Sequence, residues 1–399
     1  MASEVKHIDL YYDNADSRKS ALRLVLALRP EWEPSQDTIE FVRFTDGITN
    51  TLLKAENRFP GLSQHDIDQE AILLRAYGRG TDVLIDRNRE CASHSSLAAH
   101  QLAPPLFARF NNGLLYKFIE GKVCSPEDLR RSEIFRGVAK RLAEWHAVMP
   151  VAVPSPLAKP VPNIWTVMQK WITALTEDTP AEKEQKALLN SELTWLTEKL
   201  SKATGIGNQL YIFAHCDLLS GNVIVLPPAV SEPASTSPHS SSASSPALSA
   251  ISTEPATLPV SFIDYEYATP SPAAFDIANH FAEWGGFDCD FSVLPTRSQR
   301  REFLQAYLSS YNSFLNRKFD PADLDQLFAE VDAFRGAPGF YWGIWALIQA
   351  KISTIDFDYA NYAQVRLGEY WAWKDALLRE AGAEKGEIPL RERRWAQEE

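Results

Sequence analysis

Two short β-type runs flank a segment that cannot fold by itself, and this arrangement most limits how the chain can fold. The runs are NVIVL, residues 222–226, and PVSFIDYEY, residues 259–267. Of the 32 residues from 227 to 258, 22 are Ser, Pro or Ala, so we expect this insert to be disordered. Long inserts cost little free energy at a hairpin tip. The two runs are therefore predicted to pair as a hairpin, which brings Asp264 close to Asn222.

The octapeptide HCDLLSGN, residues 215–222, directly precedes the first run. Its spacing, H-x-D-x-x-x-x-N, is that of the catalytic loop of protein kinases, where the Asp accepts the proton of the attacking hydroxyl and the Asn binds Mg²⁺. Mg²⁺ usually takes one or two protein oxygens and completes its shell with phosphate and water. We therefore predict Asp217 as the catalytic base, with Asn222 and Asp264 as metal ligands. A turn capped by Asp217 explains the octapeptide alone equally well, but Asp264 makes the catalytic interpretation the stronger one.

The first 120 residues are predicted to be rich in strands. Residues 17–29 have the spacing of an amphipathic helix that ends before Pro30. A second helix is expected from about residue 86 to 101, and Asn111-Asn112-Gly113 is a strong hairpin signal. The strand-like runs are IEFVRF, ITNTLLKAE, EAILLRAYG, PLFARF and GLLYKFIEG.

After Gly121 the apolar spacing becomes mostly helical, beginning with a helix that has Pro126 near its first turn. The predicted architecture is α+β, with a small β-rich lobe over residues 1–120 and a larger, mainly helical lobe over residues 121–399. The first lobe also carries the N-terminal helical extension, and the second carries the insert 227–258.

The strand-rich part also contains residues suited to nucleotide phosphates. The segment FTDGITNT, residues 44–51, lies between two predicted strands, where a loop covering a nucleotide is expected, although an ordinary hairpin turn explains it as well. Arg75 is a cation inside an apolar strand, which is costly unless it meets an anion. ATP phosphate is such an anion, and a helix carboxylate such as Glu90 would steady the guanidinium. The predicted ATP-binding residues are Thr45, Gly47, Thr49, Asn50, Arg75 and Glu90.

Charge and composition exclude several classes of protein. The formal net charge is −12, so the chain has no basic field to hold a polyanion, and we expect no nucleic-acid partner. The four cysteines lie far apart without metal-binding spacing, which favours reduced thiols in the cytoplasm. The uncharged run 336–350 is shorter than the roughly 18 residues that a membrane span needs. The sequence allows a homodimer but does not specify the oligomeric state.

Seven segments together resemble the choline/ethanolamine kinase family, and its ethanolamine kinase branch in particular. They are RFTDGITN, LLRAYG, FNNGLLYKFIEG, HCDLLSGN, FIDYEY, FDIANHFAEW and WALIQAKISTIDFDY. The resemblance extends over about residues 41–370 in the family's order. It implies the two-lobed protein-kinase-like fold, Mg²⁺, and ATP-dependent phosphorylation of the ethanolamine hydroxyl, the first step towards phosphatidylethanolamine.

The resemblance also implies roles for individual residues. It gives Asp217, Asn222 and Asp264 the catalytic and metal-binding roles already described, and it puts Arg75 and residues 44–51 at the nucleotide phosphates. The positions that match the family's amine pocket are Glu266, Glu283, Trp342, Trp345 and Tyr362.

The implied amine pocket also has a physical basis in the sequence. Trp342 and Trp345 share a helix face and are able to offer ring faces to a cation, although aromatic stripes usually form core. Glu283 follows Asp276 on an otherwise apolar helix, where carboxylates require polar or cationic partners. We expect Asp276 to support the catalytic loop from behind, and Glu283 and Glu266 to face the substrate.

Two positions depart from the family pattern. Cys216 stands where the family more often has Asn, and Asp288 stands where choline kinases tend to carry a pocket tyrosine. A quaternary ammonium is best held by an aromatic cage, whereas a primary ammonium has three donors that require acceptors such as carboxylates. Asp288 therefore favours ethanolamine, with a choline kinase or a dual-specificity kinase as the alternative.

Two further alternatives concern the class of protein. A kinase-like scaffold would have lost Asp217, Asn222 or Asp264, and all three are present. A protein kinase would carry D-F-G and A-P-E motifs, but here IDYEY stands in the place of the first and nothing evident corresponds to the second. An aminoglycoside kinase can share the acidic surface and the H-x-D-x-x-x-x-N spacing but is not expected to carry the tryptophan pair.

Overall fold

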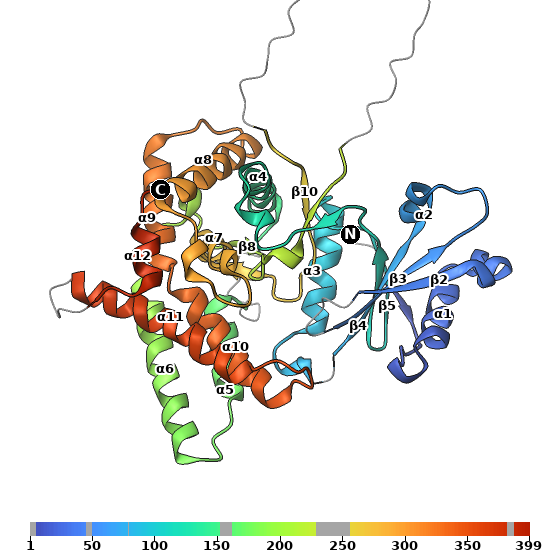
Figure 1. Cartoon of the computed structure of the whole chain (residues 1–399), viewed down its shortest axis with the longest axis horizontal. Coiled ribbons are helices and arrows are strands. Elements are labelled where there is room, and N and C mark those ends of the chain that lie inside the picture. The colour runs from blue at the N-terminus through green and yellow to red at the C-terminus, as the bar shows by residue number, and fades with distance from the viewer. Residues whose placement is uncertain (1–4, 45–49, 79, 152–161, 229–255, 381–386) are drawn as a thin grey trace, which may run out of the picture.

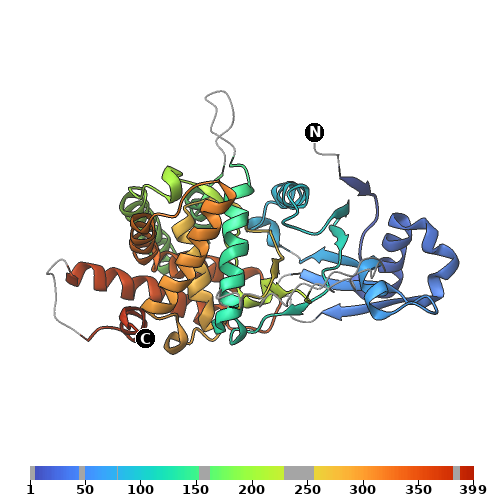
Figure 2. The same ribbon diagram turned by 90° about the horizontal axis from the view of Figure 1, so that it is seen from above.

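The chain folds into two lobes that lie side by side (Figures 1 and 2). The computed structural model describes residues 5–44, 50–78, 80–151, 162–228, 256–380 and 387–399. The smaller lobe is built on a β-sheet and the larger lobe is mainly helical. The predicted α+β, two-lobed fold class is therefore confirmed, whereas most of the insert predicted to be disordered lies outside the described residues.

A six-stranded sheet forms the smaller lobe, in the order β1-β5-β6-β4-β3-β2. The strip β5-β6-β4-β3-β2 is antiparallel throughout, and only β1 pairs with its neighbour in parallel. The five longer strands fall on the predicted runs, and β5 and β6 form the predicted hairpin. The strands are β1 (Lys6–Ile8), β2 (Ile39–Phe44), β3 (Asn50–Asn57), β4 (Ile72–Tyr77), β5 (Leu106–Phe110) and β6 (Gly113–Lys117).

Strand β4 explains why Arg75 faces the larger lobe. Alternate side chains of a strand point to opposite faces of the sheet. Ile72, Leu74 and Ala76 pack in the core that contains helix α1 (Ser17–Leu28). Leu73 and Arg75 therefore point the other way, towards helix α3 (Arg87–Ala99), which lies between the sheet and the helical lobe (Figure 1).

The larger lobe packs its helices around one extensive apolar core. Its first helix, α4, was predicted to begin near Pro126 but begins at Ser132. Asp128 accepts a hydrogen bond from the backbone N–H of Ser125 at 3.1 Å, and Arg131 is extended, with φ −77° and ψ 130°, so a separate turn precedes the helix. Helix α4 ends at Val148, and the short helix α2 (Gln64–Glu70) belongs to the smaller lobe. The remaining helices of the larger lobe are α5 (Ile164–Ala174), α6 (Pro180–Leu200), α7 (Ala273–Ala282), α8 (Arg297–Phe314), α9 (Pro321–Phe334), α10 (Ala337–Ile352), α11 (Tyr359–Glu380) and α12 (Leu390–Ala396).

Two small sheets hold the segment that carries the predicted catalytic loop. Strands β9 (Val223–Val225) and β10 (Val260–Phe262) pair antiparallel, with Val225 opposite Val260, which confirms the hairpin predicted across the insert. Strand β7 (Lys122–Val123) pairs with β9, so we propose the lobe boundary at about residue 120. Strands β8 (Ile212–Ala214) and β11 (Thr269–Ser271) form the second pair. Among the described residues, no helix is both long and apolar enough to cross a membrane.

Candidate active site

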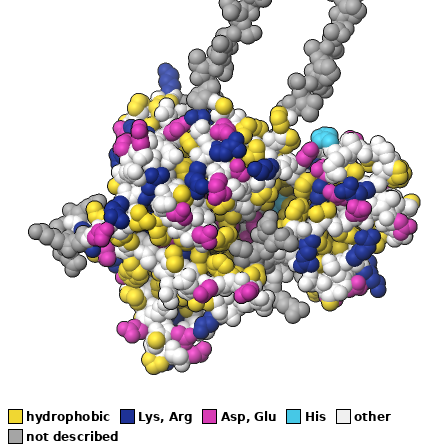
Figure 3. All heavy atoms as spheres, viewed as in Figure 1, with side chains coloured by type: hydrophobic (Ala, Val, Ile, Leu, Met, Phe, Trp, Pro, Cys, Tyr) yellow, Lys and Arg dark blue, Asp and Glu magenta, His cyan; other side chains and the backbone are white. Residues whose placement is uncertain are grey.

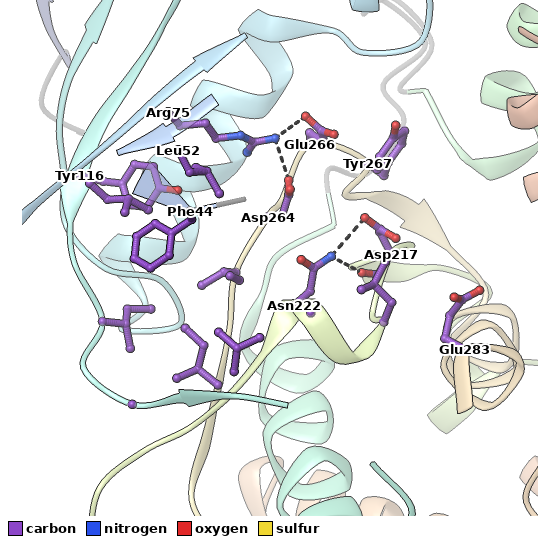
Figure 4. A pocket seen from close by; sticks show the side chains of 18 of the residues that line it. Phe44, Leu52, Arg75, Tyr116, Asp217, Asn222, Asp264, Glu266, Tyr267 and Glu283 are labelled. Atoms are coloured by element: carbon purple, nitrogen blue, oxygen red, sulfur yellow. Dashed lines mark hydrogen bonds and ion pairs between the residues drawn. The ribbon is translucent and has the colours of Figure 1, made fainter. Parts of the chain in front are cut away.

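A cavity of about 250 Å³ lies between the two lobes and is lined by residues of both. One end is mainly apolar, with Phe44, Leu52 and Tyr116 from the sheet of the smaller lobe. The other end reaches Glu283 of the larger lobe, and Asp217 lies between the two ends (Figure 4). This order matches a site in which a nucleotide and a second substrate meet at Asp217.

Asp276, in the first turn of α7, holds the loop that precedes Asp217. Its two carboxylate oxygens accept hydrogen bonds from the backbone N–H groups of His215 and Cys216, at 2.9 and 2.7 Å. The His146 ring lies 2.9 Å from the same carboxylate. The prediction that Asp276 supports this loop from behind is confirmed. Cys216 has φ +63°, a left-handed conformation that Asn adopts more readily than Cys, so these bonds hold a strained residue in place.

Asn222 lies against Asp217, as the motif predicts. Its side-chain amide donates to the Asp217 backbone carbonyl at 2.8 Å and to Asp217 Oδ2 at 3.1 Å. Its own amide oxygen therefore points away from Asp217 and is able to act as a ligand. Burial, together with the carboxylates of Asp264 and Glu283, raises the pKa of Asp217 well above its ordinary value. A carboxylate with a raised pKa is a stronger base.

The residues beside Asp217 fit a magnesium ion carried by a nucleotide. Buried Asp217 Oδ1 accepts no hydrogen bond from the residues that the structure describes, whereas Asp264 Oδ1 forms an ion pair with Arg75 at 2.8 Å. Ile263 donates its backbone N–H to the Asn222 carbonyl at 3.1 Å, which ties the strand leading to Asp264 to the loop. In the described ranges no group of three His, Cys, Asp or Glu side chains forms a metal cluster. Two oxygen ligands are what Mg²⁺ usually takes from a protein when phosphates supply the rest.

Arg75 stands at the centre of an ion cluster that joins the lobes. Its guanidinium lies 2.9 Å from Glu90 and 2.8 Å from Asp264, and it also pairs with Glu266. Burial would lower the pKa of Arg75, but the carboxylates of Asp264, Glu266 and Glu90 outweigh it and raise the pKa. The predicted contact between Arg75 and Glu90 is therefore present. Figure 4 shows Arg75 reaching across from the sheet to Asp264 and Glu266.

Arg87, which the sequence did not single out, completes this cluster. It pairs with Glu90 at 3.0 Å and with Glu266 at 3.1 Å, and its guanidinium lies 3.9 Å from the Tyr77 ring centre. The sequence signal that could have identified Arg87 is its position three residues before Glu90 in the first turn of α3, where the two side chains lie on one face of the helix. Asn50 also contacts Glu266, donating its amide at 3.2 Å.

The remaining predicted phosphate-binding residues are not all described. Thr45, Gly47 and Thr49 lie outside the described residues, so their roles stay predictions. Asn50, Arg75 and Glu90 come together around Glu266, beside the predicted metal ligand Asp264.

The other end of the cavity is aromatic and contains one buried carboxylate, Glu283. The rings of Trp342 and Trp345, both on α10, are nearly perpendicular and 5.5 Å apart between centres. Their indole N–H groups are already bound, to Asn279 at 2.8 Å and to the Tyr267 hydroxyl at 2.7 Å, so they present rings to the cavity. Glu283 Oε1 accepts from Arg366 at 3.0 Å. Tyr362 also lines the cavity.

Asp288 does not leave a gap in the aromatic wall, which corrects one argument for ethanolamine. Asp288 is exposed and does not line the cavity, while Phe287, although 40% exposed, lines it with its ring centre 6.2 Å from that of Tyr362. Helix α7 ends at Ala282, and Gly286 has φ +63°, so the chain reverses before these residues. The ring predicted to be missing is thus supplied by the preceding residue.

A β-sheet lobe, a helical lobe and an Asp-Asn-Asp constellation between them define a phosphotransferase of the protein-kinase-like fold. The sequence profile of the family described as Choline/ethanolamine kinase matches residues 41–371. The chain belongs to the choline/ethanolamine kinase family.

Several known proteins resemble the chain over most of its length. "Ethanolamine kinase 1" of Mus musculus is 34% identical, covering 93% of this chain and 94% of the relative. "Ethanolamine kinase 1" of Homo sapiens is also 34% identical, covering 90% and 72%. Among solved structures, a Plasmodium vivax ethanolamine kinase has a TM-score of 0.69 at 24% identity, covering 90% of this chain and 89% of that one. A choline kinase of Cryptosporidium parvum has a TM-score of 0.65 at 20% identity, covering 94% and 98%.

Proposed function

We propose that this protein transfers the γ-phosphoryl group of ATP to the hydroxyl of ethanolamine, giving phosphoethanolamine for phosphatidylethanolamine synthesis. The observation that carries the proposal is the order of groups along one cavity: an apolar end with the Arg75 cluster, then Asp217, then Glu283 among aromatic rings. Curated relatives named ethanolamine kinase support the choice of substrate.

The nucleotide belongs at the end of the cavity formed by the sheet. Leu52, Leu73 and Ile224 offer apolar surface to a base. Arg75 is a buried cation next to Asp264, and its planar guanidinium suits phosphate oxygens. Asn222 and Asp264 would hold Mg²⁺, which when bound neutralises negative charge on the phosphates. Arg75 and Arg87 are predicted to add to that neutralisation from the side of the smaller lobe.

Asp217 acts on the second substrate. The base accepts the proton of the ethanolamine hydroxyl as its oxygen attacks the terminal phosphorus, and the bond from that phosphorus to the bridging oxygen of ADP breaks. Asn222 and Asp276 fix the position of the base, so catalysis rests mainly on alignment and charge. The ammonium end of ethanolamine lies against Glu283, with Trp342, Trp345 and Tyr362 around it.

We also propose that the reaction takes place in the cytoplasm, in keeping with four buried and unpaired cysteines. On the face shown in Figure 3, acidic and basic side chains are interspersed over the helical lobe, which agrees with the absence of nucleic acid among the proposed partners. The homodimer that the sequence allows stays a prediction.

Steady-state turnover with Mg²⁺ and ATP, comparing ethanolamine and choline at matched concentrations, tests the proposal. We expect a higher kcat/KM for ethanolamine. A preference for choline would assign the sister activity instead. Turnover of neither amine would contradict the proposal.

A further inference from the structure

A row of alternating charges leads from the cavity into the C-terminal part of the chain. Glu283 Oε1 pairs with Arg366 Nη2 at 3.0 Å, and Arg366 Nε lies 3.3 Å from Glu369 Oε1. The other oxygen of Glu369 lies 3.4 Å from Arg391 Nε. The row therefore connects a cavity residue after α7, through two residues of α11, to a residue of α12.

The row continues beyond Arg391. Arg391 Nη1 lies 3.0 Å from Glu392, whose carboxylate lies 2.8 Å from Arg335 at the end of α9. Acidic and basic side chains alternate along all six positions. We call this set the charge row: Glu283, Arg366, Glu369, Arg391, Glu392 and Arg335.

The inner members of the charge row are buried. Arg366 is 0% exposed, Glu369 3% and Arg391 2%. Removing one partner of a buried ion pair leaves an uncompensated charge, which is strongly unfavourable. Each inner member of the row therefore depends on both neighbours, and a change at one position alters the pairing of the next.

Helix α12 is held in place by contacts that do not belong to the charge row. The Trp395 indole donates to Asp332 at 2.9 Å, and its backbone carbonyl accepts from Arg300 at 2.9 Å. The backbone N–H of Arg297 donates to the Gln397 carbonyl at 2.8 Å. The family match ends at residue 371, so α12 lies beyond it. A substitution in the row can therefore be compared with one that loosens α12 alone.

We infer that Arg366, Glu369 and Arg391 are positioning residues that orient the carboxylate of Glu283 towards the substrate ammonium. The C-terminal helix α12 thereby sets the affinity for the amine. This inference rests on the proposed function, because it assigns the amine to the Glu283 end of the cavity.

The geometry gives a reason for this effect. One oxygen of Glu283 is fixed by Arg366, which fixes the direction of the other oxygen. The Arg366 guanidinium also lies 5.7 Å from the ring centre of Tyr362, another wall of the cavity. If Arg391 loses its charge, Arg366 is the one cationic partner left to Glu369 among the described residues, and Glu369 draws it away from Glu283. The amine end then loses the orientation of both its carboxylate and this ring.

The test is steady-state kinetics of the full chain carrying Arg391→Met or Arg391→Lys. We expect Arg391→Met to raise the KM for ethanolamine about fivefold, within the range typical of coupling through packed networks. The KM for ATP and kcat should stay within about twofold, because Arg391 contacts neither the nucleotide end nor Asp217. Arg391→Lys keeps the charge but loses the planar fork, so it should restore part of the affinity for ethanolamine.

Arg300→Lys is the matched control. Arg300 is 0% exposed and anchors α12 through the Trp395 carbonyl, but it contacts no carboxylate of the charge row. We expect it to lower the melting temperature without changing the KM for ethanolamine. Equal changes in the KM for ethanolamine in Arg391→Met and Arg300→Lys would show that docking of α12 alone matters, and would overturn the inference.

A milder variant covers the case in which Arg391→Met does not fold. Glu392→Gln removes the outer charge while keeping the side-chain shape, and should raise the KM for ethanolamine by about twofold without affecting the KM for ATP. An unchanged KM in both Glu392→Gln and Arg391→Lys would also overturn the inference. Failure of the proposed function is distinguishable, since the unmodified protein would then not turn over ethanolamine at all.

Discussion

Glu266 and Glu283 are two buried carboxylates of the helical lobe that line one cavity, yet they are held in opposite ways. Glu266 is 2% exposed and pairs with Arg75 and Arg87, both from the smaller lobe. Glu283 is 4% exposed and pairs with Arg366 of its own lobe. The first pairing crosses between the lobes, whereas the second stays within one core.

The two ends of the cavity therefore depend on different kinds of contact. The nucleotide end depends on how the lobes approach each other, because its arginines and its carboxylates come from opposite sides. The amine end depends only on packing inside the helical lobe. The prediction that Glu266 contacts the amine stays a prediction, and we propose that Glu283 is the main partner of the ammonium because two arginines already contact Glu266.

The largest expected effect comes from Asp217→Asn, which alters the point where the two ends meet. Removing the base should lower kcat about a thousandfold, within the range for general base catalysis, while the contacts at both ends remain. Turnover assays would measure kcat, and isothermal titration would measure the affinity for ATP separately. Retention of full activity would exclude Asp217 as the base.

The next effect separates the amine end from the nucleotide end. Glu283→Gln keeps the shape of the side chain but removes the charge opposite the ammonium, so we expect the KM for ethanolamine to rise about tenfold. The KM for ATP should change little. Asp288→Asn is the control, because Asp288 is exposed and does not line the cavity. A similar KM for ethanolamine in Glu283→Gln and the unmodified protein would contradict the assignment.

The same two ends differ in how far the sequence could predict them. At the nucleotide end, the strand-like apolar run EAILLRAYG identified β4 and showed Arg75 as a buried cation, and the proximity of Asn222 and Asp264 followed from removing the insert. These signals are local or involve strands that pair as neighbours. The contact between Arg75 and Glu90 could therefore be predicted before the fold was known.

At the amine end the sequence was less informative. The direction of Phe287 and Asp288 depends on a turn after α7 with Gly286 at φ +63°, and helical periodicity does not extend past Ala282. Arg366 and Arg391 pair with carboxylates that are distant in the chain, and no spacing rule connects them. Tertiary packing decides these contacts, so they became visible only in the structure.

Arg87→Met tests the claim that the nucleotide end depends on contacts between the lobes. Loss of the guanidinium removes one of the two arginines, Arg75 and Arg87, that pair with both Glu90 and Glu266 among the described residues. We expect the KM for ATP to rise about threefold, because one charged contact near the nucleotide is lost. The KM for ethanolamine should stay unchanged. Exposed Arg109 provides the control in Arg109→Met. An equal rise in both KM values would show that the two ends are not independent.

The smallest effect is expected from removing residues 229–255. Leu226 donates its backbone N–H to the Pro259 carbonyl at 3.0 Å, so β9 and β10 stay paired up to the point where the insert begins. Ala256 is kept because its carbonyl accepts from Arg136 at 3.2 Å. A shorter connection between paired strands changes the loop-closure entropy by only about 1–2 kcal/mol. We therefore expect kcat and both KM values to stay within about twofold, measured beside the unmodified protein. A large rise in the KM for ATP alone, or in the KM for ethanolamine alone, would mean that the insert acts on the nucleotide end or on the amine end of the cavity, respectively.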